Sequence, residues 1–317
     1  MRKAALAKVH ALAARDANVV YIGSDPGAGT LDAMRREFPD RFFIEGISEA
    51  HILGMAAGLA MEGFVPYVNT IATFLTRRCY EQVAIDVALH HLPVRLIANG
   101  GGVVYAPLGP THCAIEDIAL MRAVPNMTVV CPADAGEMER FMDTTLDWPG
   151  PIYIRLAKGG DPKVTRPEHG FAIGRAVPLR EGDDVLLVAT GIATGRAVEA
   201  ADRLAGQGVA VGVLHMPTVK PLDAPALCAW ASRVGLIVTV EEHVRNGGLG
   251  SAVLEALSDA GELSGPVLRL ALPDAFLHNY GSQDGLMARA GLTADGLVAQ
   301  IEAALVRRSA PKGSGKR

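Results

Sequence analysis

A single carboxylate, Glu49, stands at the start of an apolar stretch in which Ile52, Met55 and Leu59 recur at helical spacing. Ser48, directly before it, is a residue type that caps helices, so Glu49 is expected in the first turn. The helix N-terminus favours the charged carboxylate by about 0.3–1 kcal/mol, whereas burial favours the neutral acid by up to about 4–7 kcal/mol. A buried Glu49 is therefore predicted to hold or share a proton near neutral pH, as a general acid or base must. The alternative interpretation is a solvated first-turn glutamate.

Two ring side chains add to this chemistry. His112 closes the sequence GPTH, which follows the glycine run 100–102, and the ordinary pKa of histidine suits a residue that moves protons. Phe74 lies in the segment TFLTRRCYEQV, and an aromatic ring gains about 0.5–1.5 kcal/mol from an offset flat partner. A structural histidine and a core phenylalanine are the alternatives that these residues leave open.

The elements that must position these side chains follow a strand–helix alternation. Short apolar, β-branched runs predict strands at 18–23, 64–68, 93–98, 127–131 and 151–156. A long helix is predicted between the second and third strands, and the alternation resumes from residue 184 onwards. This pattern predicts an α/β fold with largely parallel sheets. Gly54 and Gly58, four apart on the Glu49 helix, are expected to let another backbone approach closely.

Length and composition limit the classes of protein that fit. The 317 residues suit two domains of ordinary size. A net charge of −4 gives no indication of nucleic-acid binding or of an anionic membrane partner, and no apolar run approaches the ~18 residues of a membrane span. The N-terminal residues predict an amphipathic helix rather than a signal peptide. Four scattered cysteines without a CxxC pair predict a reduced, cytoplasmic protein without a zinc site.

Two segments, GISEAHILGMAAGLAMEG and GPTHCAIEDIALMRAVPNMTVVCPAD, resemble transketolases and 1-deoxyxylulose-5-phosphate synthases. VEEH followed by GGLGSAV is similar to the C-terminal domain of that family. The resemblance covers nearly the whole chain, but only the second half of a full transketolase. It implies two three-layer αβα domains: a pyrimidine-binding domain over 1–160, a linker over 161–180 and a transketolase C-terminal domain over 181–308. The remaining tail, 309–317, is polar and predicted to be disordered.

The resemblance also implies roles for the candidate residues. In the family, a glutamate contacts N1′ of the aminopyrimidine ring of thiamine diphosphate and promotes the imino tautomer. An aromatic residue stacks on that ring, and a histidine handles the hydroxyl and carbonyl protons of the substrate. By this resemblance Glu49 and His112 are catalytic, and Glu49 and Phe74 bind the cofactor. Asp25, in the loop SDPGAGTLD, and Tyr80 are further cofactor-binding candidates.

Substrate binding is assigned by the same resemblance to His112, Arg77 and Lys158. Arg77 matches an arginine that meets substrate in the synthase branch, with a solvated helix charge as the alternative. Lys158 falls where the family places an arginine that grips the substrate phosphate, and Arg155 is a weaker candidate. Lysine can hold an anion as a point charge but lacks the bidentate fork of arginine. A solvated lysine at the end of a strand is the alternative.

The sequence departs from the family pattern beside the GPTH motif. Transketolases and the synthases usually carry an acidic residue before this glycine, where the chain has Leu108, and no histidine occupies the region of Asn99. In the family that acid contacts sugar hydroxyls. The ordinary pentose phosphate substrates therefore do not follow from the resemblance. The glycine-rich loop is instead similar to a branch of split transketolase-like subunits.

A diphosphate site is missing from the sequence. Enzymes that use thiamine diphosphate need a GDG motif followed by Asn to hold Mg²⁺, because the charge of two buried phosphates must be met. No such motif occurs here. We therefore expect an N-terminal transketolase subunit that carries the diphosphate and Mg²⁺ site, and a homodimer of this chain within an α₂β₂ heterotetramer.

The predicted reaction is transfer of a two-carbon ketol unit from a ketose, expected to be a phosphate, to an aldose. One alternative is a subunit similar to deoxyxylulose-phosphate synthase or to the β-subunit of a 2-oxoacid dehydrogenase. Another is a regulatory paralogue without catalytic activity. The motif TFLTRR favours the synthase, whereas GPTHxxIED favours transketolase.

Overall fold

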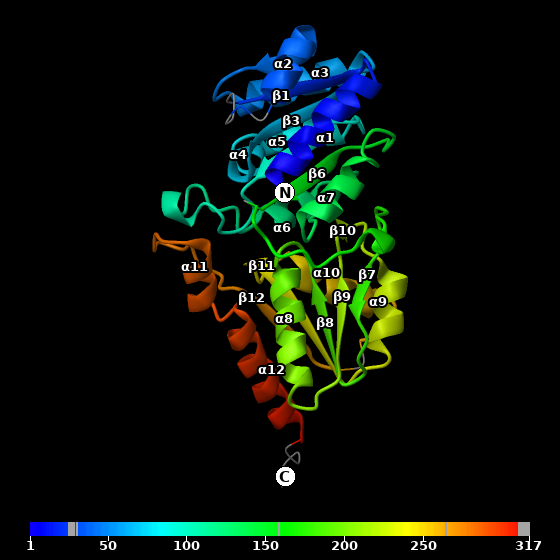
Figure 1. Cartoon of the computed structure of the whole chain (residues 1–317), viewed down its shortest axis with the longest axis vertical. Helices are drawn as coiled ribbons and strands as arrows, with labels where there is room; N and C mark the ends of the chain where they lie inside the picture. Colours follow the sequence, from blue (N-terminus) through cyan, green and yellow to red (C-terminus); the bar gives the residue numbers. More distant parts are fainter. Residues whose placement is uncertain (25–28, 30, 158, 264, 310–317) are drawn as a thin grey trace.

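The computed structural model describes residues 1–24, 29, 31–157, 159–263 and 265–309. Its elements form two sheets with helices against their faces, one in each half of the chain (Figure 1). Most neighbouring strands run parallel, and the α/β class with two αβα units is confirmed. None of the helices in the described ranges is long and apolar enough to cross a membrane.

The first sheet has seven strands in the order β10-β5-β6-β4-β3-β1-β2. Its strands are β1 (Val19–Gly23), β2 (Phe42–Ile44), β3 (Val65–Ile71), β4 (Arg95–Asn99), β5 (Thr128–Val130), β6 (Ile152–Leu156) and β10 (Thr218–Lys220). The central strands β4 and β6 are mostly apolar and are buried at every position, as expected for parallel strands covered on both faces. Only β10 is antiparallel to its neighbour, and it comes from the second half of the chain.

Helices cover both faces of this sheet. On one face, α1 (Arg2–Arg15) and α7 (Ala135–Met142) share a core with β1 and β6. On the other face lie α3 (Glu49–Met61), α4 (Ala72–Thr76), the π-helix η2 (Val83–Ala88) and α6 (Asp117–Ala123). The remaining short helices of this half are α2 (Asp32–Glu37), η1 (Pro39–Arg41), α5 (Tyr80–Gln82) and η3 (Ala106–Leu108).

The second sheet has five strands in the order β12-β11-β8-β9-β7. These are β7 (Val177–Arg180), β8 (Val185–Ala189), β9 (Val211–His215), β11 (Leu236–Val244) and β12 (Val267–Leu272). Its helices are α8 (Ala193–Ala205), α9 (Ala224–Ala231), α10 (Leu249–Asp259), α11 (Gln283–Arg289) and α12 (Ala294–Ser309), and η4 (Pro167–His169) precedes β7. One core cluster holds side chains from both halves, among them Leu96 and Leu249. The two halves are therefore packed together (Figure 1).

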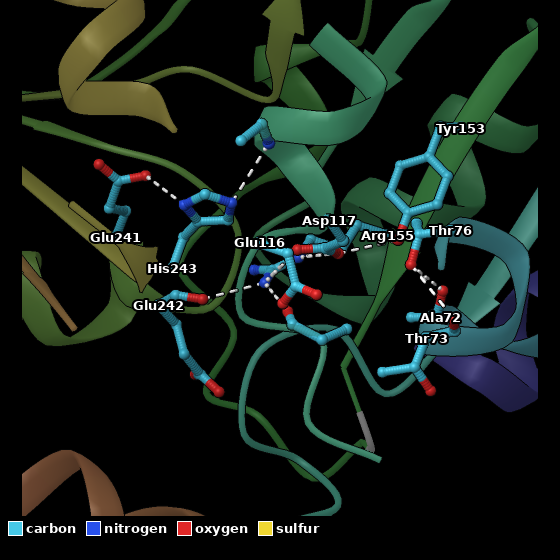
Figure 2. Close-up of polar contacts among 12 residues, drawn as sticks. Ala72, Thr73, Thr76, Glu116, Asp117, Tyr153, Arg155, Glu241, Glu242 and His243 are labelled. Carbon is cyan, nitrogen blue, oxygen red and sulfur yellow. Dashed lines mark hydrogen bonds and ion pairs between the residues drawn. The ribbon is translucent and has the colours of Figure 1, made fainter. Parts of the chain in front are cut away.

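The structure differs from the predicted elements in two places. The long helix expected after β3 is broken, because β3 continues to Ile71 and α4 ends at Thr76. The Thr76 hydroxyl donates to Ala72 O at 2.9 Å, a local bond that competes with helix geometry (Figure 2). The second difference is β7, which occupies the last residues of the predicted linker and pairs antiparallel with β9.

Candidate active site

A cavity of about 260 Å³ opens where three parallel strands of the first sheet end. Ligands of open α/β sheets bind at this edge, outside the carboxyl ends of the strands. The residues that line it are Arg2, Ser24, Ile47, Glu49, Asn69, Thr70, Ile71, Phe74, Asn99, Tyr105 and His112. The cavity therefore brings together the three side chains whose chemistry the sequence singled out.

Glu49 is the first residue of α3, and only 1% of it is exposed. The helix buries Ile52 of the predicted stripe, and Met55 and Leu59 pack partly buried against the core, which holds the carboxylate against the sheet. Ser48 occupies the N-cap position, but its hydroxyl donates to Glu45 O at 2.8 Å instead of capping the helix. Burial is thus present, while the expected cap bond is not.

Arg78 is the partner of Glu49 that the sequence analysis missed. Its Nη1 donates to Glu49 Oε2 at 2.7 Å, and its Cζ lies 4.1 Å from the centroid of the Phe74 ring. The Arg78 side chain is 43% exposed, whereas the carboxylate is buried. The guanidinium therefore contacts both groups to which the family resemblance assigns the aminopyrimidine ring.

Phe74 and His112 meet in the cavity. Their ring centroids lie 5.3 Å apart at an interplanar angle of 71°, an edge-on contact. His112 Nδ1 lies 2.9 Å from the Thr111 hydroxyl. The histidine belongs to the loop before α6, which begins at Asp117. Phe74 lies in α4, so two separate segments contribute the two rings of this contact.

The structure places Arg77 and Tyr80 outside the lining of the cavity. Arg77 forms an ion pair with Glu116 and donates to Pro110 O at 3.2 Å and to Cys113 O at 3.0 Å. The hydrogen bond to Glu116 raises the pKa of Arg77. Arg77 thus fastens the loop that carries His112. Tyr80 donates its hydroxyl to Leu120 O at 3.0 Å and packs against the core, which supports α6.

The predicted sites Asp25 and Lys158 lie outside the described residues. Arg155, the weaker phosphate candidate, is described, and its side chain is only 8% exposed. It donates from Nε to Asp117 Oδ2 at 2.8 Å and from Nη2 to Asp117 Oδ1 at 3.0 Å. Arg155 is therefore a buried structural cation rather than an anion-binding residue.

The glycines at 100–102 leave space for the side chains of Tyr105, Arg155 and Glu242, which a Cβ at these three positions would overlap. A Cβ on Gly100 would lie 2.1 Å from Cε2 of Tyr105, and one on Gly101 would lie 2.5 Å from Cγ of Arg155. Gly100 also has a φ of +76°, which favours glycine. The ring of Tyr105 reaches the cavity through this gap. The glycine run and the nearby aromatic were visible in the sequence, but their packing was not.

A second group of charged side chains is buried between the two halves (Figure 2). We call it the interdomain cluster: Asp117, Arg155, Glu241, Glu242 and His243. Besides its bonds to Asp117, Arg155 Nη2 donates to Glu242 O at 2.9 Å, and Tyr153 donates its hydroxyl to Asp117 Oδ2 at 2.8 Å. The cluster joins β6 and the first residue of α6 to β11, so it fixes the two halves together.

Two acids of the interdomain cluster, Glu241 and Glu242, accept hydrogen bonds from backbone N–H groups. Glu241 accepts from the amides of Leu249 and Gly250, at the start of α10, at 2.7 and 2.8 Å. Burial nevertheless raises its pKa to about 7. Burial also raises the pKa of Glu242, which accepts from Val103 N at 2.7 Å, and lowers the pKa of His243. The hydrogen-bond partners of these groups lie within the described part of the chain, which indicates a structural role.

The sequence matches two family models. Residues 1–160 match the transketolase pyrimidine binding domain, and residues 174–297 match the transketolase C-terminal domain. The chain belongs to the transketolase family. It is 42% identical over 294 residues to 1-deoxy-D-xylulose-5-phosphate synthase of Syntrophotalea carbinolica, covering 92% of this chain and 46% of the relative. The chain thus spans about half the length of that synthase.

Two other transketolase-family proteins match most of their own length. A putative uncharacterized transketolase family protein, y4mN of Sinorhizobium fredii, is 39% identical over 296 residues, which cover 92% of this chain and 85% of that protein. A solved structure described as a split gene transketolase, inactive beta4 tetramer, superposes with a TM-score of 0.86 at 37% identity, covering 96% of this chain and 97% of that one. Chains of this length therefore recur in the transketolase family.

Enzymes of the transketolase family use thiamine diphosphate, and the residues present fit one half of that cofactor. Glu49 supplies a buried carboxylate, Phe74 a ring face, and Asn99 a buried carbonyl oxygen without a partner among the described residues. In the described ranges, no group of three or more His, Cys, Asp or Glu side chains is arranged to hold a metal ion. The fit thus concerns the aromatic ring of the cofactor.

Proposed function

We propose that this chain is the pyrimidine-binding, C-terminal subunit of a split transketolase that moves a two-carbon ketol unit from a ketose to an aldose. The observation that carries the proposal is the cavity that joins a buried Glu49 to Phe74 and His112. The match over nearly the full length of a split gene transketolase supports it. The 42% identity to a deoxyxylulose-phosphate synthase supports a second candidate, an acyloin-forming synthase subunit.

Each lining residue has one task in this proposal. Thiamine diphosphate supplies the electron sink that cleavage of a carbon–carbon bond beside a carbonyl needs. Glu49 exchanges a proton with the pyrimidine ring, and Phe74 lies against that ring. His112 takes and returns the proton of a substrate hydroxyl, since it lines the same cavity and its free ring nitrogen is not bound by a described residue. Asp25 and Lys158 stay candidates for cofactor and substrate binding.

Arg78 must release Glu49 and Phe74 before a pyrimidine ring can bind them. It pairs with the carboxylate at 2.7 Å and covers the phenyl ring at 4.1 Å. A guanidinium is flat and carries N–H donors, as an aminopyrimidine does, so it can occupy the same place. Its partial exposure gives it room to move outward. We therefore propose that Arg78 competes with the cofactor.

An exposed apolar face beside Glu49 supports the need for a partner subunit. Ile47 is 80% exposed before α3, Met61 is 56% exposed at its end, and Leu89 beyond η2 is 65% exposed. Between them, Gly54 and Gly58 are exposed, and a Cβ added to either would have no atom within 4 Å. No described backbone packs against this glycine surface of α3. We propose that the N-terminal subunit covers it in an α₂β₂ assembly and brings the diphosphate and Mg²⁺ site.

Activity measured with and without the partner tests this function. The chain is purified alone and together with a transketolase N-terminal subunit that carries GDG and Asn, both with thiamine diphosphate and Mg²⁺. We expect ketol transfer from a ketose phosphate only in the mixture, and none from the chain alone. Turnover of pyruvate instead would select the synthase. A stable complex inactive on both donors would select the regulatory paralogue and overturn the proposal.

A further inference from the structure

We propose that Tyr280, in the second half of the chain, is a positioning residue for His112, so that the second half controls where this imidazole lies. The segment concerned is residues 102–115, which we call the His112 loop. The inference rests on the proposed function, because it takes His112 to move the protons of the substrate. By sequence the loop belongs to the first half, within the residues that match the pyrimidine binding domain.

The His112 loop packs into the core of the second half. Val103, Ala106 and Cys113 are buried in one apolar cluster with side chains of β8, β11 and α11. Leu277, from the segment before α11, packs against the same cluster. Figure 1 shows α11, in orange, close to the blue-green loop. The position of the loop therefore follows that of the second half, although its sequence belongs to the first.

Hydrogen bonds to the second half hold both ends of the His112 loop. At its start, Val103 N donates to Glu242 Oε1 at 2.7 Å, and Gln283 Nε2 donates to both oxygens of that carboxylate at 2.9 and 3.0 Å. At its end, Val244 N donates to Ile115 O at 2.8 Å. A buried donor or acceptor that loses its partner is costly, so the two ends are fixed relative to β11.

Tyr280 contacts the middle of the loop, close to His112. Its ring rests on Gly109, since a Cβ at Gly109 would lie 2.6 Å from Cε1 of Tyr280. The φ of Gly109 is +80°, a conformation that favours glycine, so this position keeps room for the ring. His112 N donates to Gly109 O at 3.0 Å, which closes a β-turn between them. Gly109 and His112 therefore form one unit against the Tyr280 ring.

The imidazole takes its place from this turn. Its Nδ1 lies 2.9 Å from the Thr111 hydroxyl, inside the turn, and the ring meets Phe74 edge-on at 5.3 Å. Arg77 holds the turn from the first half through Pro110 O. Without the Tyr280 ring the turn would keep Arg77 but could shift away from Phe74. Proton transfer requires hydrogen-bond reach, so a small shift of the imidazole is expected to slow the reaction.

NMR of the full chain tests the position of His112 without turnover. With selectively labelled His and Phe, the ring protons of His112 and Phe74 should give an NOE, because the ring centroids lie 5.3 Å apart. His112→Gln identifies the signals. Tyr280→Ala should lose this NOE and shift the His112 signals, whereas Tyr280→Phe keeps the ring and should keep both. Because Tyr280 is 66% exposed, Tyr280→Ala should unfold close to wild type in urea.

Kinetics of the reconstituted complex then separate positioning from binding. Tyr280→Ala should lower kcat about tenfold and leave KM within about twofold, because it displaces His112 without removing a group that holds cofactor or substrate. Tyr280→Phe should keep the wild-type kcat. The control is Asn279→Ala, the exposed neighbour in the same segment, which keeps the Tyr280 ring and should behave like wild type in both measurements.

An NOE that survives in Tyr280→Ala would overturn the positioning role, as would an equal loss in Asn279→Ala. An active complex in which Tyr280→Ala loses the NOE but keeps the wild-type kcat would overturn it as well. The proposed function fails separately. A wild-type complex that transfers no ketol unit contradicts the function, whereas the NOE in the chain alone still decides whether Tyr280 holds His112 beside Phe74.

Discussion

The cavity of Glu49 and the interdomain cluster are two buried sites with charged side chains, and they differ in how many hydrogen-bond partners those side chains have. In the interdomain cluster, Arg155 and Asp117 share two hydrogen bonds, and both Glu241 and Glu242 accept from backbone amides. In the cavity, Glu49 accepts from the half-exposed Arg78 and, at 3.5 Å, from the Thr70 hydroxyl, and Asn99 has an acceptor without a donor in the described structure. Among the described residues, the charged groups of the interdomain cluster have their partners, whereas the cavity keeps a polar atom without one.

The difference separates structural charges from functional ones better than burial does. Glu49 and Glu241 are both almost fully buried glutamates. Only Glu49 faces a cavity with a ring, an imidazole and unpaired polar atoms. We therefore expect substitutions in the cavity to change activity with little effect on stability, and substitutions in the interdomain cluster to do the reverse.

The largest effect is expected from Glu49→Gln, assayed as ketol transfer in the reconstituted complex. Loss of its proton exchange should lower kcat by about 10²- to 10⁴-fold, the usual range for a general acid or base. The control is Glu62→Gln at the exposed end of the same helix, which should keep full activity. A Glu49→Gln complex within threefold of wild type would remove Glu49 from the mechanism.

Arg155→Met should break the interdomain cluster and lower the free energy of unfolding by about 3–5 kcal/mol, because it leaves Asp117 buried without its cation. Urea denaturation of the isolated chain measures this. Arg203→Met is the matched control, since Arg203 pairs with Glu199 and Asp295 on the surface and should cost at most about 1 kcal/mol. Equal losses in the two variants would contradict the structural role of the cluster.

Glu241 should make stability depend on pH. Its pKa rises from 4.5 to about 7 on folding, so its contribution is fully present below pH 4.5 and is lost as pH rises through 7. Between pH 5 and 8, wild type should lose about 2.5 kcal/mol relative to Glu241→Gln, from 1.36 kcal/mol per pKa unit.

The groups beside Glu241 titrate in both variants, so the difference isolates it. Glu242, with a raised pKa, acts in the same direction. His243, with a lowered pKa, acts in the opposite one, because its contribution is lost as pH falls. Parallel pH profiles for wild type and Glu241→Gln would show that Glu241 does not titrate in this range.

Arg78→Gln should have the smallest effect and the opposite sign. It removes an ion pair and a ring contact that compete with the cofactor, so thiamine diphosphate should bind the complex about tenfold more tightly. Calorimetry gives the affinity, and thermal unfolding of the chain alone should show a slight loss. Arg77→Gln, the neighbouring arginine that holds the His112 loop, should not tighten binding. Weaker binding in Arg78→Gln would mean that Arg78 assists the cofactor.

The local sequence pattern was enough to predict the parallel strands and the helix that begins at Glu49, because the spacing of apolar residues determines which positions are buried. The break after β3 was not predicted. The roles of Arg77 and Arg78 were not predicted either, because the two residues are adjacent and of the same type, yet Arg77 pairs with Glu116 and Arg78 pairs with Glu49, which lie in distant segments. No local signal tells two neighbouring arginines apart. Tyr105 was missed for a related reason, because its place over Gly100 is decided by tertiary packing.

Strand β10 has a consequence for how the molecule can be divided. Residues 218–220 belong to the second half of the sequence but hydrogen-bond to β5 along the margin of the first sheet. A fragment that ends at residue 160 would leave the N–H and C=O groups on the outer side of β5 without strand partners, and such an edge strand promotes self-association. Truncation of the chain at this point would therefore yield a fragment that aggregates, even though each half has a sheet of its own.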